Sequence, residues 1–381
     1  MGPSSADELG TTPNRASLRD VARLAGVSTS TASRVLSGST HPVGEGTRRR
    51  VLAAADQLNF APNRLARALV TARSLTIAAL VHDISDPYFA EILGGLEDVM
   101  GRSGYSLLVA SSRRDPAKEL AYIEAFQAYQ VDAIVFAASG LIDPDHIAGL
   151  ANLLDPYRRR GGVVVALSDH RYPAPSVRVG NFEASGLAVA HLAGLGHRRI
   201  GFIGGPAALS VSERRLAGYR SGLGVAGLDP NSGLVVEGDF SLEGGRAAVG
   251  QLLRRGATAV IGANDMLALG AIRELAELGA RVPADVSVVG INNVVMAEYG
   301  PVPLTTVQVP TTDLGRRGGE LVLALLAGGN DLRADATDIV LAPELVIRKS
   351  SGPPPEANGG QESPKRLEVT DPRVDPSGPR H

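Results

Sequence analysis

The N-terminal part of the chain places apolar side chains at the spacing of short amphipathic helices. After Ser17 they recur at i, i+3, i+4 and i+7, and Asp20 stands where a capping box needs an acidic residue. Gly26 ends this first helix, Ser28 begins a second, and a third is expected over about residues 47–58. The side chains expected to face inward are Leu18, Val21, Ala22, Ala25, Ala32, Val35, Leu36, Val51, Leu52, Ala55 and Leu58.

From Leu75 to about Arg348, short β-branched runs alternate with helical stretches. Strands are expected at Ile77–Val81, Ser106–Ala110, Ala133–Phe136, Val163–Leu167, Ile200–Ile203, Ala259–Ile261 and Val286–Ile291. Helical periodicity is found in stretches such as Tyr88–Arg102, Phe182–Leu195 and Met266–Leu278. Alternating strands and helices imply parallel sheets covered by helices on both faces, and about 270 residues suit two such α/β lobes.

Composition distinguishes the two ends of the chain from the rest and excludes several classes of protein. Residues 1–16 are small and polar, and residues 349–381 are rich in Pro, Gly and charge, so both are expected to be disordered tails. The chain has no cysteine, which excludes disulfides, thiol nucleophiles and Cys-ligated zinc. No run approaches the roughly 18 apolar residues of a membrane span, and no apolar leader is seen, so we expect a cytoplasmic protein.

The charge is unevenly distributed, although the net charge is only −2. Between Arg15 and Arg73 there are ten arginines against three acidic residues, so this segment is strongly basic and the remainder is acidic. A basic field of this size attracts phosphate backbones, whereas a solvated charged surface is the alternative that charge alone leaves open.

Residues 18–36 have the spacing of a helix-turn-helix, with Gly26 in the turn because a residue without Cβ passes through it cheaply. The second helix exposes short hydroxyl side chains and one arginine, which suit the major groove of DNA. An ordinary amphipathic hairpin with a Ser/Thr-rich face is the alternative. The candidate DNA-reading residues are Thr29, Ser30, Thr31, Ser33 and Arg34.

A second candidate for DNA contact follows the third helix. Pro62 ends that helix, Asn63 can cap a new one, and a small apolar stripe that includes Ala66 and Leu69 is flanked by arginines. A helix of about eight residues is marginal in water, so it would need a partner helix and DNA to form. Two such helices in a minor groove could insert Leu69 between base steps. A flexible interdomain linker is the alternative.

Together these motifs resemble the LacI/GalR family of repressors, in the order in which that family carries them. The resemblance covers residues 17 to about 348 and rests on LRDVARLAGVSTSTASRVL, TRRRVLAAADQLNFAPNRLARAL, ISDPYFAEILGGLED, LGHRRIGFIGGP, ERRLAGYRSGL, ANDMLALGAIRELAELG, VPADVSVVGINN and PLTTV. It implies an α-helical helix-turn-helix headpiece and an α/β domain of two Rossmann-like lobes, similar to periplasmic binding proteins.

The resemblance also implies a division of the chain. The headpiece would span residues 17–61, a hinge helix or linker 62–74, and an effector-binding and dimerisation domain 75–348. Within that domain, lobe one would comprise about 75–170 with 308–328, and lobe two about 171–307 with 329–348.

By the same resemblance, Thr29 and Ser30 read bases, Arg34 contacts a base or a phosphate, and Thr31 and Ser33 contact phosphates. Asn63, Ala66 and Leu69 fall on hinge positions that face the minor groove, with Leu69 as the intercalating residue. One departure is Gly44, where the family usually has a serine that caps the third helix; a glycine cap costs only a few tenths of a kcal/mol.

The effector is expected between the lobes, beyond the carboxyl ends of the strands. Candidates from lobe one are Asp83, Ser85, Tyr88 and Phe89, with Asp86 equally suited to cap a helix. Candidates from lobe two are Arg215, for which a surface salt bridge is the alternative, Asn264 and Asn292. Asp265 could serve only the dipole of the next helix.

Asn292 is the largest departure from the family, which usually has Asp there. An amide cannot offer sugar hydroxyls the charge-assisted acceptance of a carboxylate. Val309 also replaces a residue that is polar in many relatives, so a standard hexose is a less secure expectation than the fold.

Other functions have weaker support. Residues 222–227 fit GxGxxG, but they follow a helical run instead of a strand, which argues against a dinucleotide site. We expect no catalytic residue, cofactor or metal. The expected protein is a homodimeric or tetrameric regulator, in the family's default a repressor, that binds a pseudo-palindromic operator under the control of a sugar-like metabolite. A cytoplasmic sugar-binding protein without operator control is the alternative.

Overall fold

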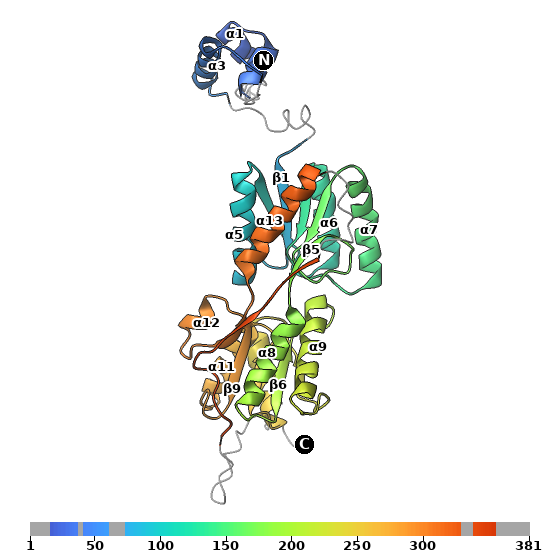
Figure 1. Cartoon of the computed structure of the whole chain (residues 1–381), viewed down its shortest axis with the longest axis vertical. Coiled ribbons are helices and arrows are strands. Elements are labelled where there is room, and N and C mark those ends of the chain that lie inside the picture. Colours follow the sequence, from blue (N-terminus) through green and yellow to red (C-terminus); the bar gives the residue numbers. More distant parts are fainter. Residues whose placement is uncertain (1–15, 37–40, 61–72, 329–337, 356–381) are drawn as a thin grey trace, which may run out of the picture. The chain divides into compact units, whose positions relative to one another are not determined.

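The computed structural model describes residues 16–36, 41–60, 73–328 and 338–355 (Figure 1). The chain divides into two compact units, residues 1–75 and 76–381. The expected hinge contacts Asn63, Ala66 and Leu69 lie outside the described residues, so their roles stay predictions.

The first unit consists of α1 (Leu18–Ala25), α2 (Thr29–Leu36) and α3 (Glu45–Gln57) around a small apolar core. Ser17 and Asp20 form the expected capping box, and Gly26 ends α1 with φ 64°, a conformation that favours glycine. Most expected core positions are confirmed by their burial in this cluster. Leu52 is the exception: 48% of it is exposed, because α3 buries Ala54, which was not expected, together with Val51 and Ala55.

Lobe one of the second unit is a parallel six-stranded sheet in the order β11-β5-β4-β3-β1-β2. Its strands are β1 (Thr76–Val81), β2 (Ser106–Ser111), β3 (Ala133–Phe136), β4 (Val163–Ala166), β5 (Ser176–Val179) and β11 (Asp338–Leu341). Its helices are α5 (Pro87–Arg102) and α13 (Thr311–Gly328), which pack together, and the pair α6 (Pro116–Ala128) and α7 (Pro144–Arg159). An Asp-Pro pair begins α5, α6 and α7, because Asp caps the helix and Pro suits its first position.

Lobe two repeats this plan, with sheet order β12-β10-β9-β8-β6-β7 and only β12 antiparallel. Its strands are β6 (Ile200–Gly204), β7 (Val235–Glu237), β8 (Ala259–Gly262), β9 (Ser287–Asn292), β10 (Thr305–Gln308) and β12 (Glu344–Val346). Its helices are the packed pairs α8 (Asn181–Gly194) with α9 (Ser210–Val225) and α10 (Leu242–Arg254) with α11 (Asp265–Glu277), and the short α12 (Met296–Tyr299).

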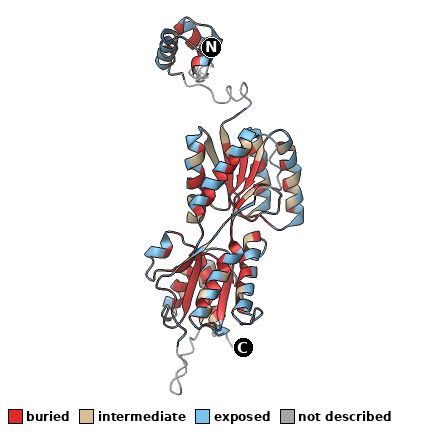
Figure 2. Ribbon diagram, in the orientation of Figure 1, coloured by how far each residue is buried: buried red, intermediate tan, exposed pale blue. Residues whose placement is uncertain are grey.

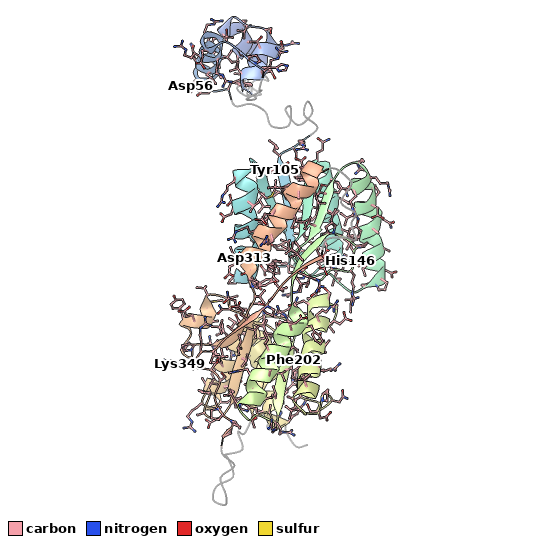
Figure 3. The ribbon with its side chains drawn as sticks, in the orientation of Figure 1. Asp56, Tyr105, His146, Phe202, Asp313 and Lys349 are labelled. Atoms are coloured by element: carbon pink, nitrogen blue, oxygen red, sulfur yellow. The ribbon has the colours of Figure 1, made fainter. Side chains whose placement is uncertain are left out.

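The central strands of both lobes are buried between the helices (Figure 2). In lobe two the ring of Phe202, labelled in Figure 3, stacks on Tyr219 of α9 with centroids 4.8 Å apart. The strands expected from the sequence are confirmed to within a residue or two. The short strands β5, β7, β10, β11 and β12 were not expected, because their few residues acquire strand geometry by pairing with distant partners.

The lobe boundaries differ from those expected. The chain leaves lobe one after β5, returns after β10 and crosses again between β11 and β12. The first crossing therefore follows Val179 and does not lie near residue 170, and β11 belongs to lobe one although residues 329–348 were assigned to lobe two. Register explains both differences, since Ser176–Val179 pairs along its whole length with Asp338–Leu341.

The sequence analysis placed the start of the C-terminal tail too early, at residue 349. Ser350 is fully buried in lobe two, where its backbone oxygen accepts from Val288 N and its hydroxyl accepts from Thr305 N at 2.8 Å. His197, also fully buried, contacts the Gly352 carbonyl oxygen at 3.0 Å. Small polar residues that look like linker in the sequence thus satisfy the ends of two strands.

Two glycines in the α8–α9 pair give a matched test of this packing. A Cβ on Gly218 would lie 2.0 Å from the carbonyl oxygen of Phe182, whereas one on Gly186 would meet nothing within 4 Å. We expect Gly218→Ala to lower the free energy of unfolding by about 1–3 kcal/mol through overpacking. Gly186→Ala should raise it by up to about 1 kcal/mol through helix propensity. Urea denaturation measures both, and equal stabilities would contradict the close helix contact.

Candidate DNA-binding face and effector cleft

Helix α2 presents a polar face to solvent. Thr29, Ser30, Ser33 and Arg34 are exposed, whereas Ala32 and Val35 hold the opposite face in the core. This face carries the side chains that the sequence analysis predicted to contact DNA. The short hydroxyl side chains among them permit close approach to a base or phosphate.

Thr31 lies at the edge of this face and is half-buried. Its amide donates to the Ser28 hydroxyl at 3.1 Å, and the two hydroxyls are 2.8 Å apart. The Ser28 hydroxyl therefore caps α2, as expected, and orients the first turn of the helix.

A cavity lies between the two lobes, with about 50 Å³ of open space. Its lining residues are His82, Asp86, Tyr88, Phe89, Arg114, Ala137, Ser139, Ser168, Val179, Asn181, Val211, Arg215, Phe240, Asn264 and Asn292. Of the residues expected at the effector, the structure brings Tyr88, Phe89, Arg215, Asn264 and Asn292 together here. A water needs roughly 10–15 Å³ of such space, so the cavity has room for a few water molecules.

Asp83 and Ser85 do not line the cavity, contrary to expectation. Asp83 accepts from the Ser85 amide and hydroxyl within the loop that follows β1, and it pairs at 3.0 Å with Arg113, which follows β2. The Ser85 hydrogen bond lowers the pKa of Asp83. Asp86 caps α5 by accepting from the Tyr88 amide at 3.0 Å, and it also lines the cavity, where burial raises its pKa.

Arg215 is the central polar group of the cavity and is only 3% exposed. It donates to Asn181 Oδ1 at 2.9 Å, to Asn292 Oδ1 at 3.0 Å and to the Ala263 carbonyl oxygen. Burial lowers its pKa. The surface salt bridge considered for Arg215 is therefore wrong; its neighbour Arg214 is the exposed one.

Two asparagines frame the lobe-two side. Asn264 caps α11 by accepting from Leu267 N at 2.9 Å, and its amide donates to the Phe240 carbonyl oxygen at 3.0 Å. Asn292 ends β9 with φ 129°, followed by Asn293 at φ 61°. Positive φ is rare for residues other than glycine but least unfavourable for Asn and Asp, so the backbone itself favours these residue types here.

Asp265 lies behind the cavity wall and is fully buried. It accepts from Val294 N at 2.8 Å and from the Thr306 hydroxyl, so it holds the loop that carries Asn292. Its role thus exceeds the helix-dipole contribution considered from the sequence. Burial raises the pKa of Asp265 to about 6.

Several cavity residues were missed by the sequence analysis, chiefly His82, Arg114, Ser139, Ser168 and Asn181. Each follows the end of a strand of lobe one, so the rule that ligands lie beyond the carboxyl ends of strands could have found them. Burial lowers the pKa of His82 to about 3, so its ring is neutral at physiological pH.

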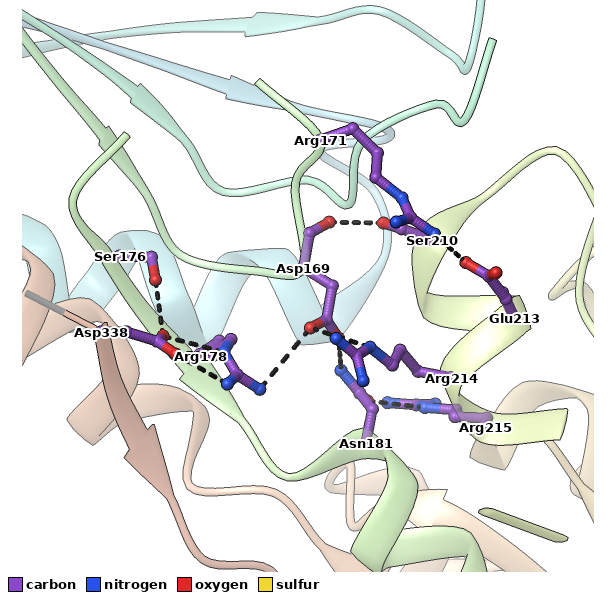
Figure 4. A network of polar contacts seen from close by, with 10 residues as sticks. All are labelled: Asp169, Arg171, Ser176, Arg178, Asn181, Ser210, Glu213, Arg214, Arg215 and Asp338. Carbon is purple, nitrogen blue, oxygen red and sulfur yellow. Dashed lines mark hydrogen bonds and ion pairs between the residues drawn. The ribbon is translucent and has the colours of Figure 1, made fainter. Parts of the chain in front are cut away.

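Polar contacts join lobe one to lobe two beside the cavity (Figure 4). The Ser210 amide, at the start of α9, donates to the Gly140 carbonyl oxygen in lobe one at 3.0 Å. The Arg171 guanidinium of lobe one pairs with Glu213 of α9. These bonds cross between the lobes near their connecting segments.

Asp169 joins this contact region to the cavity (Figure 4). It accepts from Asn181 Nδ2 at 2.9 Å and lies 3.8 Å from both Arg178 and Arg214. Arg178 in turn holds Asp338 of β11 at 2.7 Å. Asn181 therefore bridges Arg215 in the cavity and Asp169 in lobe one.

A helix-turn-helix unit with an exposed hydroxyl and arginine face, joined in one chain to a two-lobed α/β domain with a cavity between the lobes, defines a ligand-responsive DNA-binding regulator. Comparisons place the chain more narrowly. Residues 17–63 match "Bacterial regulatory proteins, lacI family" and residues 189–351 match "Periplasmic binding protein-like domain".

Individual proteins resemble nearly the whole chain. The transcriptional repressor PurR of Photobacterium profundum is 34% identical over 340 residues, covering 88% of this chain and 98% of the relative. The transcriptional regulator DegA of Bacillus subtilis is 32% identical, covering 89% and 99%. A solved structure of the lac repressor dimer, bound to operator and an anti-inducer, superposes with TM-score 0.78 at 30% identity, covering 89% and 100%.

The chain belongs to the LacI family of transcriptional regulators. It is a DNA-binding repressor of the type whose operator affinity an effector controls. The GxGxxG run lies at the C-terminal end of α9 and not after a strand, so the dinucleotide interpretation is wrong. In the part of the chain that the structure describes, no helix is both long and apolar enough to cross a membrane.

The raised pKa of Asp265 predicts a pH effect. Between its ordinary pKa near 4 and its folded value of about 6, the folded protein binds a proton that the unfolded chain has released. Its contribution to the free energy of unfolding therefore falls as pH rises through this range. The wild-type value minus that of Asp265→Asn should be about 1 kcal/mol larger near pH 5 than near pH 7.5. A difference that stays constant or grows with pH, in urea titrations at both values, would rule this out.

Proposed function

We propose that this protein is a homodimeric or tetrameric cytoplasmic repressor that binds a pseudo-palindromic operator with one α2 per half-site. A two-fold protein fits a two-fold site, because each copy then presents the same helix to the same bases. The observation that carries the proposal is the exposed face of α2 in a chain that also contains an inter-lobe cavity centred on a buried arginine. The lac repressor, which this chain resembles, was solved as a dimer on its operator. The proposal includes no catalytic step, cofactor or metal.

Within the operator complex, Thr29 and Ser30 contact base edges and Arg34 contacts a guanine edge or a phosphate. Thr31 and Ser33 contact phosphates that set the register of the helix. Phosphate contacts position the protein and base contacts select the sequence, so the loss of each kind has a different signature.

The effector site comprises Tyr88, Phe89, Arg215, Asn264 and Asn292, which line the cavity. A ligand that accepts hydrogen bonds from Arg215 replaces one or more of its present acceptors, such as Asn181. Because Asn181 also donates to Asp169 of lobe one, its movement changes that contact as well. The angle between the lobes then changes, and with it the spacing of the two hinge segments in the dimer. Reciprocity requires operator DNA to change effector affinity by the same factor.

Replacement of the arginine on α2 tests sequence readout. We expect Arg34→Ala to weaken binding to a genomic operator fragment by about 1–3 kcal/mol while binding to random duplex changes less, as measured by gel shift at several salt concentrations. Arg220→Ala, on the exposed side of α9, is the matched control and should bind as wild type does. Equal affinity of the wild type for operator and random DNA would refute a specific regulator and favour a binding protein without operator control.

The hinge carries a separate prediction. If Leu69 wedges between base steps, Leu69→Ala removes the wedge and should reduce both operator affinity and the bend in the DNA. Circular-permutation gel shifts measure the bend. A bend equal to that of the wild type would contradict the wedge role without touching the assignment of α2.

A further inference from the structure

Arg215 is a buried cation whose acceptors are all neutral. It donates to two side-chain amides, Asn181 and Asn292, and to the carbonyl oxygen of Ala263. Among the described residues it forms no ion pair within 4.0 Å. Burying a charge without a counter-charge is costly, because no water remains to solvate it. A negative charge placed in direct contact with Arg215 would therefore stabilise the site.

Arg114 supplies a second cation to the same cavity. Its Nε is buried and has no hydrogen-bond partner among the described residues. The guanidinium lies over the Phe240 ring, 5.7 Å from the centroid, and both residues line the cavity. Two guanidinium groups thus approach one space, and each of them keeps N–H donors that could hydrogen-bond to an oxyanion.

The nearby carboxylates Asp265, Asp169 and Asp86 favour the charged form of Arg215 from a distance, but among the described residues none of them pairs with it within 4.0 Å. Asp86 is the lining carboxylate, and its oxygen accepts from the Tyr88 amide at the start of α5. Asp265 accepts from Val294 and Thr306 behind the wall, and Asp169 binds Asn181 on the lobe-one side. Of the other titratable groups at the wall, Tyr88 and His82 are neutral: burial raises the pKa of Tyr88 to about 12 and lowers that of His82 to about 3.

Helix ends add to the positive potential. The first residues of long helices line the cavity, namely Asp86 before α5, Asn181 in α8, Val211 in α9 and Asn264 before α11. The N-terminus of a helix carries a partial positive charge and favours anions. In this site the helix ends reinforce the two arginines.

The remaining lining residues indicate what accompanies the charge. Phe89 and Phe240 offer apolar faces to a carbon skeleton, whereas Ser139, Ser168 and Asn264 offer hydrogen bonds to hydroxyl groups. The combination suits a small polyhydroxylated compound with one charged end.

We infer that the effector is an anion, a hydroxylated metabolite that carries a carboxylate or phosphate group, held by Arg215 and Arg114. The inference rests on the proposed function, since it names the ligand class of the same cleft. Asn292 makes this possible, because Arg215 donates to its neutral Oδ1 at 3.0 Å. An aspartate at this position would form an ion pair with Arg215 and would compete with an anionic ligand for the guanidinium.

Adjacent asparagines allow a matched test on the full chain. Asn292→Asp and Asn293→Asp add the same charge one residue apart, but Asn293 does not line the cavity and its Oδ1 already accepts from Arg348 at 2.7 Å. Thermal unfolding and titration calorimetry are measured with inorganic phosphate and with gluconate. Sodium chloride at equal ionic strength and the neutral glucitol are the controls.

We expect phosphate or gluconate to stabilise the wild type and Asn293→Asp above the chloride control. Asn292→Asp should bind these anions at least about tenfold more weakly, because its carboxylate competes for Arg215. Without ligand, Asn292→Asp should unfold at a higher temperature than wild type. Arg114→Gln should also lose at least about tenfold in anion affinity.

The inference is overturned if both anions stabilise the wild type no more than chloride or glucitol does, or if they stabilise Asn292→Asp as much as wild type. Failure of the proposed function looks different. If the chain retains a specific operator that a neutral sugar releases, the regulator proposal stands and the anion inference fails. If anions bind as expected but no DNA fragment is preferred, the anion inference stands and the operator proposal fails.

Discussion

The effector domain depends on one buried guanidinium. Arg215 projects from α9 and hydrogen-bonds to the start of α8, the end of β8 and the end of β9, so a single side chain joins segments far apart in sequence. Its burial is tolerable only because every acceptor is positioned by other interactions. Asp265 performs that task for the loop after β9, and Asp169 performs it for Asn181. Arg215 also lies in a chain of side-chain hydrogen bonds that reaches Asp169 of lobe one through Asn181.

The connections between the lobes determine how such a change can spread. The chain passes from one lobe to the other after β5, after β10 and after β11, and the paired strands β5 and β11 lie beside Asp169. Arg178 on β5 ties Asp338 on β11 to that carboxylate. A ligand that moves Asn181 therefore acts directly on the crossing strands and not on the interior of either lobe. Since packed cores resist deformation, a rotation about these segments is the expected response.

The headpiece uses its few residues differently. Its core of short aliphatic side chains fixes three helices, and α2 then exposes hydroxyls and an arginine without long hydrophobic residues. Ser28 restrains the first turn of α2, where Thr29 and Ser30 lie. Preorganised short side chains lose little entropy on binding, which favours contact with DNA through this helix.

The sequence alone determined the local elements and the class of protein, because these follow from periodicity, capping residues and motif order. The capping box at Ser17, the turn at Gly26 and the buried strands of both lobes are properties of neighbouring residues. Which polar side chains share a site depends instead on how distant segments of the chain pack together. Asp83 and Ser85 follow a strand as Tyr88 does, yet they bond to each other, and Asp83 pairs with Arg113, outside the cavity. The strands β5 and β11, the burial of Ser350 and the bonds of Arg215 are likewise long-range, and each arises from pairing or charge burial between segments that no local pattern connects.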